Sequence, residues 1–165
     1  MQILIISDTH IDNGDLTSLP SEVIEQAQKA DIVIHAGDFT SPEMLECLSN
    51  ISSSFYGVYG NHDHSSIRKH LPQVQQIESE GQKITLVHGD EWGRPRPSRL
   101  WREFHNQADL VVYGHLHLPL IVTFDGGHVV NPGSVNHPRS SRPSYAWGNY
   151  MADQNKWDIE IKYLR

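Results

Sequence analysis

The sequence predicts an α/β fold in which two β-sheets pack face to face and helices cover their outer faces. The first third of the chain alternates apolar runs with amphipathic stretches in the order β-α-β-α-β, which is typical of a parallel sheet with crossover helices. Most of the remaining apolar runs are paired around polar turns, which is typical of antiparallel hairpins. We expect both sheets to belong to one domain, residues 1–165.

Three strands and two helices are expected in the first third of the chain. Continuous runs of β-branched and other apolar residues predict strands at 2–7, 32–36 and 54–59. Pro20-Ser21-Glu22 is a suitable start for a short amphipathic helix at 21–29. A second helix is expected to begin at Ser41-Pro42, because Ser is a good N-cap and Pro is favoured at the first helical position.

The rest of the chain is expected to contain three pairs of apolar runs, one helix and one buried strand. The paired runs are 74–79 with 83–88, 119–124 with 128–130, and 144–151 with 157–163. The helix is expected at 97–106 and the buried strand at 109–113. Two loops rich in Pro, Gly, Ser and Arg, at 89–96 and 131–143, are expected to be irregular surface segments.

The composition is that of a soluble globular protein and argues against several other classes. The hydrophobic content of 38% is ordinary, and no apolar run approaches the length of about 20 residues that a bilayer requires. The formal net charge of −7 argues against a protein that binds nucleic acid by electrostatic attraction. The sequence lacks a basic and apolar leader, and Cys47 is its only cysteine, so we expect a reducing, cytoplasmic compartment.

Five short polar motifs occur in order along the chain, and most of them directly follow an expected strand. They are Asp8-Thr9-His10, Gly37-Asp38, Gly60-Asn61-His62-Asp63, His88-Gly89 and Gly114-His115-Leu116-His117. Polar clusters at the ends of buried strands lie at the rim of a sheet, where α/β proteins keep their sites. The motifs supply imidazoles, carboxylates and one amide, which is a ligand set for two divalent metal ions.

Each motif alone is also compatible with a role that involves no metal. Gly, Asp and Asn are the residues expected in turns, so Gly37-Asp38 by itself predicts a turn. Asp8 and His10 would lie on one side of an extended segment, since residues two apart point the same way. Five chance matches at successive strand ends are improbable, and the joint pattern therefore favours a metal site.

The residue types suggest individual roles. A carboxylate has two oxygens and can hold two cations close together, which makes Asp38 a candidate bridging ligand. Asn61 offers a neutral oxygen ligand and an amide donor for a phosphate. Asp63 is available to fix the tautomer of His62. His64 directly follows this motif and is the remaining histidine that we expect nearest to a substrate.

Across residues 8–117 the ordered motifs resemble those of the calcineurin-like metallophosphoesterase superfamily. The short chain and Asn131-Pro132-Gly133-Ser134 resemble its small, YfcE-like phosphodiesterase branch. The resemblance implies a four-layered α/β/β/α sandwich of two mixed sheets. It implies one metal held by Asp8, His10, Asp38 and His117, and a second held by Asp38, Asn61, His88 and His115.

The resemblance also implies a mechanism. Two divalent cations, with Mn²⁺ favoured over Fe²⁺, Ni²⁺ or Zn²⁺, would share a hydroxide that attacks phosphorus in line. His62 would be the catalytic histidine, with Asp63 as its partner, and would protonate the leaving alkoxide. The expected reaction is hydrolysis of a small phosphodiester. Two departures from the family pattern, Ile11 and Asp90, remove no expected ligand, and Asp90 bears on substrate preference.

Two other functions on the same fold stay open. A phosphomonoesterase would use the same metals, and a non-catalytic scaffold or binding module would need no catalytic histidine. The presence of His62 and of the complete ligand set favours an enzyme. The acidic balance and the absence of a basic, aromatic-rich stretch make a nuclease or another nucleic-acid partner the weaker expectation, and no membrane partner is expected.

Six arginines form two local groups in the expected loops and helix. They are Arg94, Arg96, Arg99 and Arg102 in one group, and Arg139 and Arg142 in the other. Arginine binds phosphate well, but a solvated surface is the commoner role. We therefore expect most of these side chains to be solvated and one or two to reach the mouth of the site.

Overall fold

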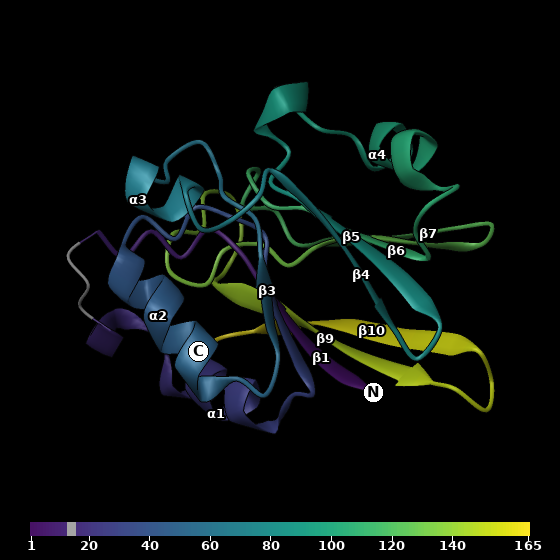
Figure 1. The fold of residues 1–165 in the computed structure, drawn as a ribbon, viewed down its shortest axis with the longest axis horizontal. Helices are drawn as coiled ribbons and strands as arrows, with labels where there is room; N and C mark the ends of the chain where they lie inside the picture. Colours follow the sequence, from purple (N-terminus) through teal and green to yellow (C-terminus); the bar gives the residue numbers. More distant parts are fainter. Residues whose placement is uncertain (13–15) are drawn as a thin grey trace.

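The protein is described by a computed structural model, which covers residues 1–12 and 16–165. Two five-stranded sheets face each other in the centre of the molecule (Figure 1). Helices α1 (Ser21–Lys29) and α2 (Pro42–Ile51) cover the outer face of one sheet, and α4 (Pro97–Phe104) covers the outer face of the other. The expected four-layered α/β/β/α sandwich is confirmed. Within the described part of the chain, no helix is long and apolar enough to cross a membrane.

The first sheet has the strand order β10-β9-β1-β2-β3. Its parallel part consists of β1 (Gln2–Ile6), β2 (Ile32–His35) and β3 (Phe55–Gly57), as the β-α-β-α-β pattern predicts. Strand β9 (Ser144–Met151) pairs antiparallel with β1 and with β10 (Lys156–Tyr163). The carboxyl ends of the three parallel strands therefore meet at one edge of this sheet.

The second sheet has the strand order β4-β5-β6-β8-β7. Its centre is parallel and consists of β5 (Gln82–Val87), β6 (Leu110–Val112) and β8 (Gly127–Asn131). Strands β4 (Val74–Ser79) and β7 (Leu120–Phe124) pair antiparallel at the two edges. This half of the chain is thus less antiparallel than its turn pattern indicated, because β5, β6 and β8 come from different hairpins and connections.

Three short helical turns were not expected from the sequence: η1 (Leu16–Ser18), α3 (Ser65–Arg68) and η2 (Asp90–Trp92). Each has three or four residues, which is too short for a hydrophobic period to appear. The predicted start of α2 is confirmed, because the Ser41 side chain accepts a hydrogen bond from the Met44 backbone N–H at 3.3 Å and Pro42 occupies the first turn.

Apolar residues fill all three spaces between the four layers. Strand β1 is buried on both faces, with Leu4 packed toward α1 and α2 and Ile5 packed toward the second sheet. Leu100 and Phe104 of α4 pack on the outer face of the second sheet. A strand that is covered on both faces gains stability from every apolar residue, which is why Ile3-Leu4-Ile5-Ile6 is continuous rather than alternating.

The sequence predicts an irregular surface segment at 131–143, but only part of this segment lies at the surface. Residues 131–135 are buried at the edge where the strands end. Burial is compatible with the polar composition because Asn131 and Ser134 hydrogen-bond to neighbouring backbone groups. The Pro, Gly and Ser content indicated an irregular backbone correctly and an exposed backbone incorrectly.

His35 at the end of β2 is a buried, neutral histidine. Its ring stacks on Phe39 at a centroid distance of 3.6 Å and is fully inaccessible to solvent. The Nδ1 atom accepts a hydrogen bond from the Gly37 backbone N–H at 3.2 Å, so the Nε2–H faces Thr9 Oγ1, also at 3.2 Å. Burial lowers the pKa of His35 to about 3, because the charged ring would have no solvent around it.

We expect His35→Asn to make the stability of the metal-free protein less dependent on pH. The folded pKa of about 3 lies below the unfolded value of 6.5, so the unfolded chain binds the extra proton in this range. Stability is therefore lost as the pH falls below 6.5, by about 2 kcal/mol between pH 7 and pH 5. Urea unfolding at both pH values should show this loss reduced in H35N and retained in His105→Asn, a surface control. Equal pH dependence of wild type and H35N would contradict the assignment.

Candidate metal centre

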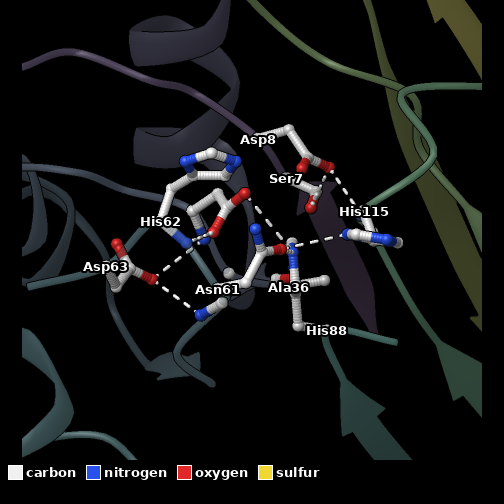
Figure 2. Close-up of polar contacts among 12 residues, drawn as sticks. Ser7, Asp8, Ala36, Asn61, His62, Asp63, His88 and His115 are labelled. Carbon is white, nitrogen blue, oxygen red and sulfur yellow. Dashed lines mark hydrogen bonds and ion pairs between the residues drawn. The ribbon is translucent and has the colours of Figure 1, made fainter. Parts of the chain in front are cut away.

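The strand ends bring all seven residues that were expected to hold metal into one cluster. Asp8 follows β1, Asp38 follows β2 and Asn61 follows β3, whereas the histidines come from the second sheet and the loop after β1. Figure 2 shows Asp8, Asn61, His88 and His115 pointing toward a common space. The seven residues are Asp8, His10, Asp38, Asn61, His88, His115 and His117.

One side of the cluster is formed by two imidazoles and two carboxylates. The Nε2 atoms of His10 and His117 lie 3.3 Å apart. His117 Nε2 is 3.2 Å from Asp8 Oδ1, and His10 Nε2 is 3.6 Å from Asp38 Oδ2. The Nδ1 atom of His117 bonds to the carbonyl oxygen of His137, which can only accept, so the Nε2 of the neutral ring carries a lone pair toward the carboxylate.

The other side of the cluster is formed by an amide oxygen and two imidazoles. Asn61 Oδ1 lies 3.1 Å from His88 Nε2 and 3.0 Å from His115 Nδ1 (Figure 2). The other ring nitrogen of each histidine faces a backbone carbonyl oxygen. His88 Nδ1 lies 2.7 Å from the oxygen of Ala36, and His115 Nε2 lies 3.0 Å from the oxygen of Gly93. Those nitrogens therefore carry the protons of the neutral rings. When both rings are neutral, as metal binding requires, three lone pairs point at one another, an arrangement that a cation stabilises.

Two buried carboxylate oxygens test whether the residues fit a metal. Asp8 Oδ1 and Asp38 Oδ2 have no hydrogen-bond partner within residues 1–12 and 16–165. The other oxygen of each group is bonded: Asp8 Oδ2 accepts from Ser7 Oγ at 2.6 Å, and Asp38 Oδ1 accepts from the His62 backbone N–H at 2.8 Å. An unpartnered buried oxygen of an ionised carboxylate is costly, and a divalent cation between the imidazoles removes that cost. The residues therefore fit a metal centre.

Most of these ligand candidates have a left-handed backbone rather than the extended one that was expected. The residues with positive φ are Asp8 (53°), His10 (47°), Asp38 (61°), His115 (66°) and His117 (53°). Asp8 and His10 still lie on one side, because the chain curls around the site. This conformation costs of order 1 kcal/mol or more for each residue, and such strain is concentrated at functional sites.

The electrostatics favour positive charge in the cluster. Burial opposes ionisation of Asp38, but the facing His88 and the His62 N–H lower its pKa to about 2. Burial likewise opposes a charge on His88, yet Asp38 and Asp8 raise its pKa to about 9. A proton on His88 thus supplies, in the metal-free protein, part of the charge that a cation supplies when bound.

Comparison with known proteins identifies the family of this chain. The family model of the calcineurin-like phosphoesterase superfamily domain matches residues 1–153. The chain belongs to this superfamily. Its members are metallophosphoesterases, which use divalent metals, and the donor cluster lies where the ordered motifs of this chain converge.

Individual relatives support the same assignment. The chain is 33% identical to a probable metallophosphoesterase of Methanothermobacter thermautotrophicus over 98% of this chain and 91% of that protein. It is 31% identical to the phosphodiesterase YfcE of Escherichia coli over 64% of this chain and 58% of YfcE. Vps29 of Chaetomium thermophilum has a similar fold, with a TM-score of 0.79 at 18% identity over 99% of this chain and 95% of that one.

Most of the residues that hold the candidate metal ligands in place were not predicted from the sequence. Asn131 donates to the Gly114 carbonyl at 2.7 Å, and Ser134 Oγ donates to the Asp8 carbonyl at 2.7 Å. Gly114 must lack a side chain, because a Cβ atom there would collide with the Ser7 hydroxyl. The motif Asn131-Pro132-Gly133-Ser134 was recognised by resemblance, but its structural role appears only once the segments are packed.

Asp63 has a different role from the one expected. Both carboxylate oxygens accept backbone N–H groups, from Gly60 at 2.8 Å, Asp38 at 2.9 Å and Thr40 at 2.8 Å. No hydrogen bond from Asp63 to the ring of His62 occurs among the described residues, and Figure 2 shows the two side chains diverging. Asp63 joins the loops that follow β2 and β3, so it positions Asp38 rather than a tautomer of His62.

We expect Asp63→Asn to destabilise the metal-free protein by about 2–4 kcal/mol, because one buried oxygen that accepts N–H groups becomes a donor facing them. Guanidinium unfolding should show a lower midpoint, and metal affinity should fall with the loss of the loop geometry. Asp31→Asn is the matched control, since exposed Asp31 accepts one backbone N–H, from Gln2. Similar midpoints for D63N and wild type would refute this role.

The structure places the remaining candidates around the cluster. His62 is exposed, and its ring meets that of His10 edge to face at a centroid distance of 5.3 Å. His64 is the N-cap residue of α3. It is not among the described residues that line the cavity beside the cluster. Of the six arginines in the two groups, Arg139 lines this cavity.

Arg68, which had no expected role, donates hydrogen bonds to the carbonyl oxygens of Gly60, Asn61 and Asp63. It therefore holds the loop that carries His62.

Proposed function

We propose that the protein is a binuclear-metal-dependent phosphodiesterase that hydrolyses small phosphodiesters. The observation that carries this proposal is a cluster of seven candidate ligands that includes two buried carboxylate oxygens without a partner among the described residues, beside an exposed histidine, His62. The phosphodiesterase name of a relative, YfcE, supports a diester substrate. A cytoplasmic location is part of the proposal and rests on the single cysteine, Cys47.

The proposed division of ligands follows the two sides of the cluster. One cation would be held by Asp8, His10, Asp38 and His117, and the other by Asp38, Asn61, His88 and His115. Asp38 would belong to both sets, because its Oδ2 atom lies 3.6 Å from His10 Nε2 and 3.4 Å from His88 Nε2. Mixed nitrogen and oxygen donors suit Mn²⁺, and also Fe²⁺, Ni²⁺ or Zn²⁺. When bound, the cations lower the pKa of water and neutralise charge on the phosphoryl group.

The chain itself supplies a proton donor and a position for the substrate. His62 is tied to the shared carboxylate through its backbone N–H, so its ring is held at the open side of the cluster. From there it donates a proton to the leaving oxygen of the ester. The amide of Asn61 is close enough to the second cation site to donate to a phosphoryl oxygen. The adjoining cavity has a volume of about 330 Å³ and is lined by His62 and by two candidate ligands, His10 and His117, so a small ester placed there reaches both.

The test is hydrolysis of bis(p-nitrophenyl) phosphate by metal-stripped protein, before and after addition of Mn²⁺. We expect activity that appears only with metal and exceeds the activity on p-nitrophenyl phosphate. A preference for the monoester would instead indicate a phosphomonoesterase. No turnover of either ester by protein that binds two metal ions, as counted by mass spectrometry, would indicate a binding module.

A further inference from the structure

The cavity beside the metal cluster contains a cationic group that the proposed mechanism does not use. The cavity is lined by His10, Asp12, His62, His117, His137, Pro138 and Arg139. Two of these are candidate metal ligands and one is the proposed proton donor. Arg139 therefore faces the space that a substrate must occupy when its ester lies between the cluster and His62.

The guanidinium of Arg139 has no charged partner among the residues that the structure describes. The side chain is exposed, and no carboxylate within residues 1–12 and 16–165 lies at ion-pair distance from it. Asp12 lines the same cavity without pairing with it. Its positive charge reaches the cluster, because Arg139 is one of the groups that act electrostatically on His117.

Arg142, in the same segment, packs against another side chain of the protein. The guanidinium of Arg142 lies over the ring of Tyr163, 5.1 Å from its centroid, and does not line the cavity. Arg142 is therefore used for packing. Arg139, three residues earlier, lines the cavity and is exposed, and no hydrogen bond or ion pair joins its guanidinium to residues 1–12 or 16–165.

A charge count indicates what Arg139 binds. With two divalent cations and the carboxylates of Asp8 and Asp38, the cluster has enough positive charge to balance the single negative charge of a phosphodiester. Arg139 adds a further charge in the cavity that His62 lines, whereas Asn61, His88 and His115 of the second cation site are not among its described lining residues. A guanidinium pairs most strongly with a phosphate, through two parallel hydrogen bonds.

We infer that Arg139 forms a subsite for a second anionic group, so that the preferred substrates are phosphodiesters that carry an additional phosphate. Asp12 lies in the same cavity and is suited to accept a hydrogen bond from a sugar hydroxyl. The inference rests on the proposed function and adds the class of substrate: a phosphorylated nucleoside or sugar diester rather than a simple diester.

The kinetic test compares two probes that differ only in one phosphate. They are the p-nitrophenyl ester of thymidine 5′-phosphate and the same ester with a 3′-phosphate. Wild type should prefer the 3′-phosphorylated probe. Arg139→Gln should lower kcat/KM for that probe about 10- to 100-fold, mainly through KM, and for the plain ester less than about 3-fold. Arg139→Lys should retain part of the preference, and Arg142→Gln should retain all of it.

A binding measurement separates this inference from the proposed function. Calorimetry with thymidine 3′,5′-bisphosphate and with thymidine 5′-phosphate, on metal-loaded protein, needs no turnover. A preference for the bisphosphate that is present in wild type and lost in R139Q supports the subsite even if neither ester is hydrolysed. An equal loss for both probes would place Arg139 on the scissile phosphoryl group and overturn the inference. No preference in wild type, or no change in R139Q, would also overturn it.

Discussion

Asp38→Asn is expected to reduce the metal content of the protein and to lower kcat/KM for bis(p-nitrophenyl) phosphate by at least about 100-fold, more than the loss of an outer partner of a ligand. The side chain keeps its size, and Asn tolerates the left-handed backbone of this position, where φ is 61°. The substitution replaces one of the two carboxylate oxygens by an NH₂ group. One must still accept from the His62 N–H at 2.8 Å, so the new NH₂ group takes the place of Oδ2. A donor then points at the space between His10 and His88, where a cation requires a negatively charged oxygen.

Metal content and rate should be measured on the same D38N preparations. Metal ions bound per chain are counted by plasma mass spectrometry after dialysis, and rates are followed at saturating Mn²⁺. Asp125→Asn is the matched control, since it makes the same change in an exposed hairpin turn. Full metal content together with a wild-type rate would show that Asp38 does not bridge two ions.

The elements that the sequence predicts well are those with a long hydrophobic period or a strong local signal. Strand β1 is a continuous apolar run because both of its faces are covered, and Ser41-Pro42 starts α2 through a side-chain bond that involves neighbours only. Strand β3 is shorter than expected, Phe55–Gly57 instead of 54–59, because it lies at an edge and pairs with β2 alone. Its extent depends on a partner strand, which the local sequence does not specify.

The candidate site divides in the same way between local and long-range information. Ligand types are predictable because each motif follows its own strand, as Asp8 follows β1. The role of Asp63 was not predictable, because its three N–H partners lie in two loops that only the fold brings together. The left-handed backbone at His115 and His117 also escapes local reasoning, since the surrounding structure imposes it.

His62→Ala is expected to separate two kinds of substrate. A proton donor matters when the leaving oxygen is basic, so hydrolysis of an alkyl phosphodiester should fall by about 10²–10⁴-fold. The p-nitrophenolate group leaves readily without a proton, and its release should fall much less. His62 is exposed and fixed through its backbone N–H rather than its ring, so removal of the ring should leave the fold and the position of Asp38 unchanged.

The measurement is the dependence of log kcat/KM on the pKa of the leaving alcohol, for a series of esters of one phosphate. The slope should be shallow in wild type, because protonation offsets the basicity of the leaving group, and steep in H62A. His105→Ala, an exposed histidine just after α4, should keep the wild-type slope. Parallel slopes for H62A and wild type would exclude His62 as the donor. The donor would then have to be sought elsewhere, first at His137, which lines the same cavity and whose ring lies 5.4 Å from that of His10.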